Sequence, residues 1–158
     1  IGLQYAKLFN CMVTGVDSEE KLEMMKSIGY DEVVDYKKID FTKSGIQYDI
    51  ILDCKTSKSG RSYLKSLKAK GKYVSIGGNL EKILSVVFWG ILVSLFSKKQ
   101  LKMLALKPNE GLETMTELFS EKKIKTVIDG PYPIEEAPYL IQYFGEGKHK
   151  GKIVISIN

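Results

Sequence analysis

Histidine and cysteine are scarce in this sequence. Its 158 residues include one His and two Cys, and no CxxC pair occurs. A typical structural zinc site needs four such ligands, so we predict no zinc site in this chain. Cys11 and Cys54 both lie in apolar, strand-like runs, and we expect buried, reduced thiols in a cytoplasmic protein. The single His149 stands among Lys and Gly residues and is expected to be solvated.

No apolar run has the length of a membrane span. The longest, ILSVVFWGILVSLF at 83–96, carries no charge but falls short of the roughly 18 residues that a span needs. The start, IGLQYAKLF, lacks the charged region and cleavage site of a signal peptide. We therefore predict no membrane partner. The run contains the only tryptophan, Trp89, and could form a core helix, an apolar substrate pocket or a dimer contact.

Basic residues are in modest excess and are spread along the chain. The sequence has 24 Lys and Arg against 19 Asp and Glu, a net charge of +5. Its densest basic piece, KKQLKMLALK, is interrupted by apolar residues. Nucleic-acid binding needs a clustered basic face, so we predict no nucleic-acid partner. A hydrophobic content of 44% with 27% charged residues is typical of a globular domain.

Short apolar runs alternate with segments of helical spacing. The runs that predict strands are CMVTGV, DEVVDY, YDIILDC, GKYVSIGG, LKMLAL, KTVIDG and GKIVISI. Apolar spacing predicts helices over 18–28, 109–122 and 134–146. The first strands are near-continuous apolar runs rather than alternating ones, as in sheets covered by helices on both faces. The regular alternation predicts an α/β fold, a doubly wound parallel sheet.

An acidic residue, Asp17, ends the first of these strands directly before a helix. Ligands of a doubly wound sheet bind beyond the carboxyl ends of its strands. A carboxylate placed there accepts hydrogen bonds from the ribose hydroxyls of adenosine. Asp17 or Ser18 could instead only cap the helix, and methyltransferase-like domains also carry an acid at such a strand end. The position indicates a nucleotide ligand without choosing which one.

Several motifs, taken in order, resemble the medium-chain dehydrogenase/reductase superfamily, especially its quinone-oxidoreductase-like and zinc-type alcohol-dehydrogenase-like members. They are MMKSIGYDEVVDY, FTKSGIQYDIILDC, YLKSLKAKGKYVSIGG and PYPIEEAPYLIQYFGEGKHKGKIVISI. The resemblance implies a Rossmann-like NAD(P)-binding domain over 1–124, lacking its first strand and most of the glycine turn. Residues 125–158 would be a carboxyl-terminal return segment that is part of the catalytic domain. The amino-terminal catalytic domain is implied as a missing partner, and a homodimer is possible.

The resemblance also implies residues that bind the adenosine half of the cofactor. Gly2 resembles the last glycine of the phosphate-binding turn. Ser18 and Lys21 resemble a pair that holds a 2′-phosphate, and Tyr36 resembles a tyrosine that closes over that phosphate. Asp17 is the usual mark of NAD, whereas the other three polar residues favour NADP. We therefore expect NADP(H) as the favoured cofactor, with NAD(H) possible.

At the nicotinamide half, Gly77 and Gly78 resemble glycines that let the cofactor ribose approach the backbone. Lys152 resembles a basic residue that folds back toward the cofactor phosphates. The chain departs from the family pattern at Lys55-Thr56, where Val-Gly often follows the strand. This departure puts the usual packing against the nicotinamide in doubt.

The implied function is that of an NAD(P)H-dependent oxidoreductase. It would transfer hydride between the nicotinamide and a small-molecule substrate, namely a quinone, an enone or a carbonyl/alcohol compound. No side chain in this chain is placed as a proton donor, so catalytic residues are unknown and would belong to the missing domain. The alternatives are a zinc-dependent alcohol dehydrogenase and a non-catalytic nucleotide-binding or scaffold member of the same fold.

Overall fold

The computed structural model describes residues 1–105 and 107–157. The chain divides into two compact units. One contains residues 1–35 together with the chain from 109 onward, and the other contains residues 36–108.

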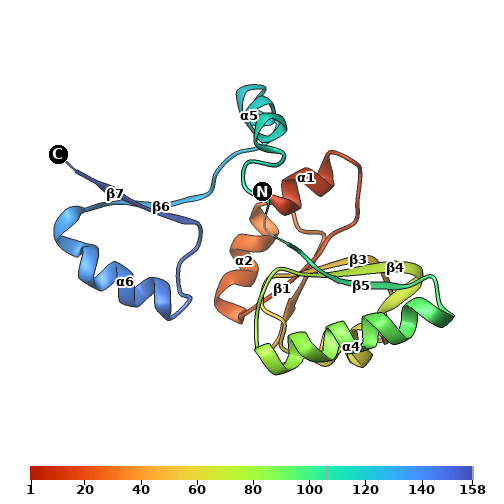
Figure 1. The fold of residues 1–158 in the computed structure, drawn as a ribbon. Coiled ribbons are helices and arrows are strands. Elements are labelled where there is room, and N and C mark those ends of the chain that lie inside the picture. Colours follow the sequence, from red (N-terminus) through yellow and green to blue (C-terminus); the bar gives the residue numbers. More distant parts are fainter. Residues whose placement is uncertain (106, 158) are drawn as a thin grey trace. The chain divides into compact units, whose positions relative to one another are not determined.

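The unit of residues 36–108 is a parallel sheet with crossover helices (Figure 1). Its elements are η1 (Phe41–Lys43), β3 (Tyr48–Asp53), α3 (Gly60–Lys65), β4 (Leu67–Ser75), α4 (Leu80–Phe96) and β5 (Gln100–Met103). The strand order is β3-β4-β5, and both pairs are parallel. Parallel neighbours cannot be joined by a tight hairpin, so α3 and α4 carry the chain back to the start of the next strand.

Two stacked tyrosines form the centre of this unit. The rings of Tyr63 and Tyr73 lie 4.1 Å apart, and both side chains are buried together with those of Leu67, Val86 and Leu101. Because Tyr63 belongs to α3, Tyr73 to β4 and Val86 to α4, this cluster joins both crossover helices to the sheet. Burial of these apolar groups is the main stabilising contribution to the unit.

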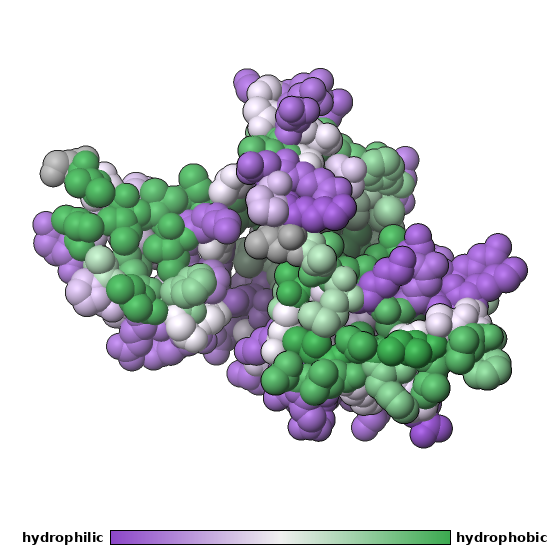
Figure 2. All heavy atoms as spheres, in the orientation of Figure 1, coloured by the Kyte–Doolittle hydropathy of each residue, from purple (hydrophilic) through white to green (hydrophobic). Residues whose placement is uncertain are grey.

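Helix α4 packs on this core by one face only. Val86 is the only α4 side chain that is buried among the residues described. Figure 2 shows the opposite face as a band of apolar side chains. Its members are Leu80, Leu84, Val87, Phe88, Ile91 and Leu95. The core interpretation of the 83–96 run therefore applies to one face of α4, and the pocket and dimer interpretations stay open for the other.

The other unit contains two small parallel sheets. Its elements are α1 (Gly2–Lys7), β1 (Thr14–Asp17), α2 (Glu19–Ser27), β2 (Glu32–Asp35), α5 (Leu112–Ser120), β6 (Ile128–Pro133), η2 (Ile134–Glu136), α6 (Ala137–Gly145) and β7 (Lys152–Ser156). β1 pairs with β2, and β6 pairs with β7. Helices α2 and α6 are the crossovers of these two pairs (Figure 1).

Local chemistry explains how α2 is bounded and how it approaches β1. Glu19 and Glu20 occupy the first turn of α2, where negative charges interact favourably with the helix dipole and stabilise the helix. Gly29 follows its end with φ of +106°, a conformation that glycine adopts without strain. Gly15 in β1 lets α2 pack closely, because a Cβ there would lie 2.3 Å from the Met25 methyl carbon.

The predicted α/β class is confirmed, because every strand pair in the described part of the chain is parallel and the strands alternate with helices. The first strand begins at Thr14 rather than at residue 11, so Cys11 lies in the preceding loop. Cys54 likewise follows the end of β3. Both thiols are free and exposed, and the expectation that they are buried was wrong. The predicted LKMLAL strand covers 101–106, and residue 106 lies outside the described residues; the strand observed there is β5, Gln100–Met103.

Within residues 1–105 and 107–157, no helix combines the length and the apolar character needed to cross a bilayer.

Two neighbouring valines in α4 allow the stability contributions of its buried and exposed faces to be compared by substitution. Val86 is 0% exposed and Val87 is 42% exposed. We expect Val86→Ala to lower the free energy of unfolding by about 2 kcal/mol, because it removes buried methyl groups and leaves a cavity. Val87→Ala is the matched control and should cost less than about 0.5 kcal/mol. Urea unfolding of the two variants makes the comparison, and equal losses would show that the packing of α4 is misassigned.

Candidate functional site

The carboxyl end of β1 places an acid and a lysine side by side. Asp17 is the last residue of β1, and Lys21 lies in the first turn of α2. The Lys21 Nζ atom is 3.9 Å from the Asp17 Oδ2 atom. The Lys21 side chain is 15% exposed and that of Asp17 is 40% exposed. The cation is thus held close to the strand end by a partly shielded ion pair.

The other Asp17 oxygen faces the start of its own helix. Its Oδ1 atom accepts a hydrogen bond of 2.8 Å from the Ser18 backbone N–H. Ser18 occupies the N-cap position of α2, but its hydroxyl makes no capping hydrogen bond. Of the two predicted caps, neither uses its side chain in the usual N-cap bond to the first turn. The structure therefore brings together Asp17, Ser18 and Lys21, as the sequence predicts.

A surface hollow of about 220 Å³ lies beside this ion pair. Its lining combines α2 with the turn that precedes β7. The lining residues are Asp17, Lys21, Met24, Ile28, Val127, His149, Lys150 and Gly151. Two lysines and a histidine thus stand beside a single carboxylate. A hollow of this composition favours a small anionic group.

The turn at residues 148–151 is fixed by backbone contacts. Lys150 donates its backbone N–H to the Asp129 Oδ2 atom at 2.8 Å. Lys152 donates its backbone N–H to the Val127 carbonyl oxygen, also at 2.8 Å. Gly151 has φ of +157°, and a Cβ there would lie 2.5 Å from the same Val127 oxygen. Only glycine permits this close approach of the turn to the start of β6.

Two tyrosines complete the environment of Asp129. Tyr132 donates its hydroxyl to Oδ1 at 2.6 Å, and Tyr143 donates to Oδ2 at 3.2 Å. The hydrogen bond from Tyr132, with those from Lys150 and Tyr143, holds the pKa of the Asp129 carboxyl below its usual value. The same carboxylate raises the pKa of Tyr132 to about 12. Asp129 therefore joins β6, α6 and the turn through charge-assisted hydrogen bonds.

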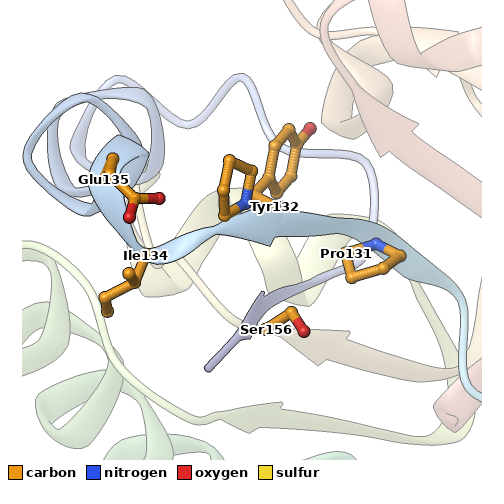
Figure 3. Close-up of a pocket in the computed structure, with 6 residues that line it drawn as sticks. Pro131, Tyr132, Ile134, Glu135 and Ser156 are labelled. Atoms are coloured by element: carbon orange, nitrogen blue, oxygen red, sulfur yellow. The ribbon is translucent and has the colours of Figure 1, made fainter. Parts of the chain in front are cut away.

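A second hollow, of about 420 Å³, lies next to Tyr132 and has a different character. Figure 3 shows the Tyr132 ring pointing away from Ile134 and Ser156, which also line it. Glu135 is the one charged residue in its lining. Among the residues described, no cationic side chain lines this second hollow, whereas Lys21 and Lys150 line the first. We therefore take the hollow beside Lys21 as the candidate anion site.

His149 is the functional candidate that sequence reasoning missed. Its ring stacks on Phe144 with centroids 4.7 Å apart. Its Nδ1 atom is buried and has no hydrogen-bond partner among the described residues. His149 lies in a loop, as expected, but its side chain is only partly exposed, because Phe144 near the end of α6 stacks on the ring. The sequence did offer one signal for this stacking: Phe144 stands five positions before His149, with the turn residue Gly147 between them.

Two further predicted residues lie outside the hollow's lining. Gly2 is the first residue of the six-residue helix α1 and is exposed. Lys152 begins β7 and its side chain is exposed, whereas its neighbour Lys150 lines the hollow. The roles assigned to Gly2 and Lys152 stay predictions.

Gly77 and Gly78 lie in the other unit, where the chain leaves β4. Thr56 donates its backbone N–H to the Gly77 carbonyl oxygen at 2.8 Å and accepts one from Asn79 at 3.0 Å. Gly78 has φ of +137°, and a Cβ there would lie 2.3 Å from the Thr56 nitrogen. Both the conformation and the space therefore require glycine at 78. Its predicted contact with the nicotinamide ribose is not tested by this packing.

A buried network of hydroxyl groups lies at the carboxyl ends of β3 and β4. The Thr56 hydroxyl lies 2.6 Å from the Ser75 hydroxyl and 3.0 Å from that of Tyr73. Tyr73 donates to the Asp53 carboxylate at 2.9 Å. Burial, reinforced by that carboxylate, raises the pKa of Tyr73. Thr56 departs from the family pattern, but its side chain is fully buried and its hydroxyl is hydrogen-bonded.

The neighbouring departure, Lys55, has an exposed side chain. Its backbone N–H donates to Asp53 at 2.9 Å. Tyr36 directly follows β2 and is 57% exposed. Tyr36, Gly77 and Gly78 all belong to the unit of residues 36–108, and the roles assigned to them stay predictions.

Comparison with known proteins decides the family. Residues 28–155 match the family of zinc-binding dehydrogenases. The chain belongs to that family. The predicted membership of the medium-chain dehydrogenase/reductase superfamily is confirmed by the same match and by the relatives that follow.

The relatives in this family are named oxidoreductases. The chain is 35% identical to the chloroplast envelope quinone oxidoreductase homolog of Arabidopsis thaliana, covering 97% of this chain and 47% of that protein. It is 28% identical to a zinc-type alcohol dehydrogenase-like protein of Schizosaccharomyces pombe, covering 95% of this chain and 46% of that one. The chain thus spans about half the length of the curated relatives that it matches.

Solved structures show the same fold. The quinone oxidoreductase of Coxiella burnetii superimposes with a TM-score of 0.75 at 20% sequence identity. The match covers 98% of this chain and 48% of that one. The fold is therefore that of the Rossmann-like NAD(P)-binding domain of this superfamily.

The family's name implies zinc, but the residues described do not fit a zinc ion. No three His, Cys, Asp or Glu side chains gather in the described part of the chain as they would around a metal. Cys11 and Cys54 belong to different units. No zinc chemistry is assigned to these residues.

The Tyr132–Asp129 hydrogen bond makes a pH-dependent prediction. Because the folded state raises the pKa of Tyr132 to about 12, the stability from this bond is complete below the ordinary tyrosine pKa of about 10. It is lost as the pH rises from there through the raised value. In a titration of phenolate absorbance, Asp129→Asn should lower the raised pKa of Tyr143 and should move Tyr132 back toward its ordinary pKa. Tyr132→Phe should delete that tyrosine's transition, and an unchanged Asp129→Asn curve would contradict the assignment.

Proposed function

We propose that this chain is the cofactor-binding domain of an oxidoreductase. It would transfer hydride between a nicotinamide cofactor and a quinone, enone or carbonyl/alcohol substrate. The observation that carries the proposal is the hollow at the carboxyl end of β1, where Asp17 and Lys21 face the 149–151 turn. Ligands of doubly wound sheets bind at such strand ends. The names of the relatives support the reaction class.

Within this proposal, NADP(H) is the favoured cofactor and NAD(H) the alternative. The two differ by a 2′-phosphate on the adenosine ribose. Lys21, Lys150 and His149 line the hollow with positive or hydrogen-bonding groups. Asp17 would repel a phosphate, but one of its oxygens is bonded to Ser18 and the other lies beside Lys21. These contacts offset its charge and support a site that accepts the added phosphate.

At the other end of the cofactor, we propose that Gly77 and Gly78 lie against the nicotinamide ribose. Thr56 holds both glycines by backbone hydrogen bonds and packing, so this backbone is fixed before any cofactor binds. The cofactor itself would supply the hydride chemistry, and the protein would supply placement. Tyr36, Gly2 and Lys152 keep their proposed contacts with the cofactor phosphates.

We further propose that residues 125–158 belong with a catalytic domain that contributes the substrate site. Its β6–β7 sheet has two strands and exposes Ile128 and Val154. A sheet of this size is marginal alone, and its open edges favour added strands. The catalytic residues would lie in that domain, and a homodimer is compatible with the exposed face of α4.

Hydrogen exchange tests this domain assignment on the chain alone. We expect the amides of β6 and β7 to exchange faster than those of β3 and β4, because the latter lie in a three-stranded sheet with a buried core. Equal protection in a chain proven to be monomeric would contradict the assignment. It would place residues 125–158 in this chain's own core.

Cofactor titration tests the leading proposal in the protein that includes its catalytic domain. Lys21→Ala should weaken NADPH about tenfold, through loss of a charge-assisted hydrogen bond of ~1.4 kcal/mol, and should leave NADH unchanged. Lys26→Ala removes an exposed charge from the same helix and is the control. Equal weakening of both cofactors would rule out the 2′-phosphate role. Tight NADPH binding without turnover of any quinone or enone would favour a non-catalytic binding protein.

A further inference from the structure

We propose that Asp129 is a positioning residue for cofactor discrimination. It would hold the 148–151 turn so that Lys150 and His149 form the second wall of the 2′-phosphate site, facing Lys21. This inference rests on the proposed function. Asp129 does not itself line the hollow. By fixing the turn that carries Lys150 and His149, it would nevertheless strengthen anion binding there.

The geometry separates Asp129 from the ligand. Asp129 does not line the hollow, whereas the residue it bonds, Lys150, does. Its carboxylate accepts from three donors: the Tyr132 hydroxyl, the Tyr143 hydroxyl and the Lys150 backbone N–H. These donors disperse its negative charge and stabilise it in one orientation. An anion in the hollow would therefore meet the turn rather than the acid behind it.

The turn has few other restraints. Lys152 N–H bonds to Val127 on its carboxyl side. On its amino side, Lys148 N–H bonds to the Tyr143 carbonyl oxygen at 3.3 Å and Phe144 stacks on His149. The Asp129–Lys150 bond lies between these contacts and is the one that fixes the backbone of a lining lysine. Without it, Lys150 would lose its fixed backbone position opposite Lys21. Preorganised donors bind more tightly than donors that must be ordered on binding.

The contribution of His149 follows from the same arrangement. One ring nitrogen, Nδ1, is buried without a hydrogen-bond partner among the residues described. A buried polar atom of this kind gains most from a ligand that supplies the missing partner. The ring is already held by Phe144, so little side-chain freedom would be lost on binding.

The experiment measures NADPH and NADH dissociation constants for variants of the protein that includes its catalytic domain. Asp129→Ala and Lys150→Ala should each weaken NADPH about tenfold and leave NADH within about twofold. Asp129→Asn keeps an acceptor oxygen for the Lys150 N–H and should retain most of the NADPH affinity. Lys148→Ala is the control: it removes the same charge from the same turn, but Lys148 pairs with Glu146 and does not line the hollow.

The outcomes separate this inference from the proposed function. If Lys21→Ala, Lys150→Ala and Asp129→Ala each lose the preference for NADPH, the result supports both the positioning role of Asp129 and the proposed function. If Lys21→Ala alone changes the preference, or if Asp129→Ala weakens both cofactors equally, the positioning role is overturned and the proposed function stands. If Lys21→Ala leaves the preference unchanged, the hollow is no 2′-phosphate site: the positioning role and the NADP(H) assignment both fail, and the proposed oxidoreductase domain stands with NAD(H) as its cofactor. Should Asp129→Ala not fold, the comparison of Lys150→Ala with Lys148→Ala decides.

Discussion

Parallel pairing of neighbouring strands is the constraint on which the rest of this structure depends. A parallel pair requires the chain to return to the far end of the sheet before the next strand begins. Helices α2, α3, α4 and α6 make these returns, and the cores form where they pack back on the strands. The arrangement also gathers the carboxyl ends of paired strands at one edge. Residues far apart in sequence, such as Asp53 and Ser75, are paired there for that reason.

The strand ends of the two units differ in the groups that they present. At the end of β1, a charged pair and a basic turn offer side chains to a ligand. At the ends of β3 and β4, polar side chains are instead buried beneath a glycine backbone, with Thr56 linking Tyr73 and Ser75. The end of β1 offers charge, and the ends of β3 and β4 offer a backbone held in place by buried hydrogen bonds.

Local features of the sequence were sufficient to predict most elements, whereas long-range contacts were not. Apolar runs and acidic first turns predicted the strands and α2 because those signals are local. The start of β1 was misplaced because the loop before it is fixed by Asp31, whose carboxylate accepts from the Val13 N–H at 2.6 Å. Asp17 was proposed from its place at a strand end, and Ser18 and Lys21 from the family resemblance. His149 and Lys150 were not, since their positions depend on Phe144 and on Asp129, which is 21 residues away from Lys150.

The two exposed cysteines give this molecule a practical property. The sequence has only Cys11 and Cys54, and each compact unit carries one of them at its surface. Thiol-directed dyes would therefore label each unit once, and energy transfer between the pair would report the distance between units in solution as cofactor is added. The same exposure has a cost during handling. In air, dioxygen oxidises surface thiols of neighbouring molecules to intermolecular disulfides, so covalent dimers in a non-reducing gel would reflect oxidation rather than native assembly.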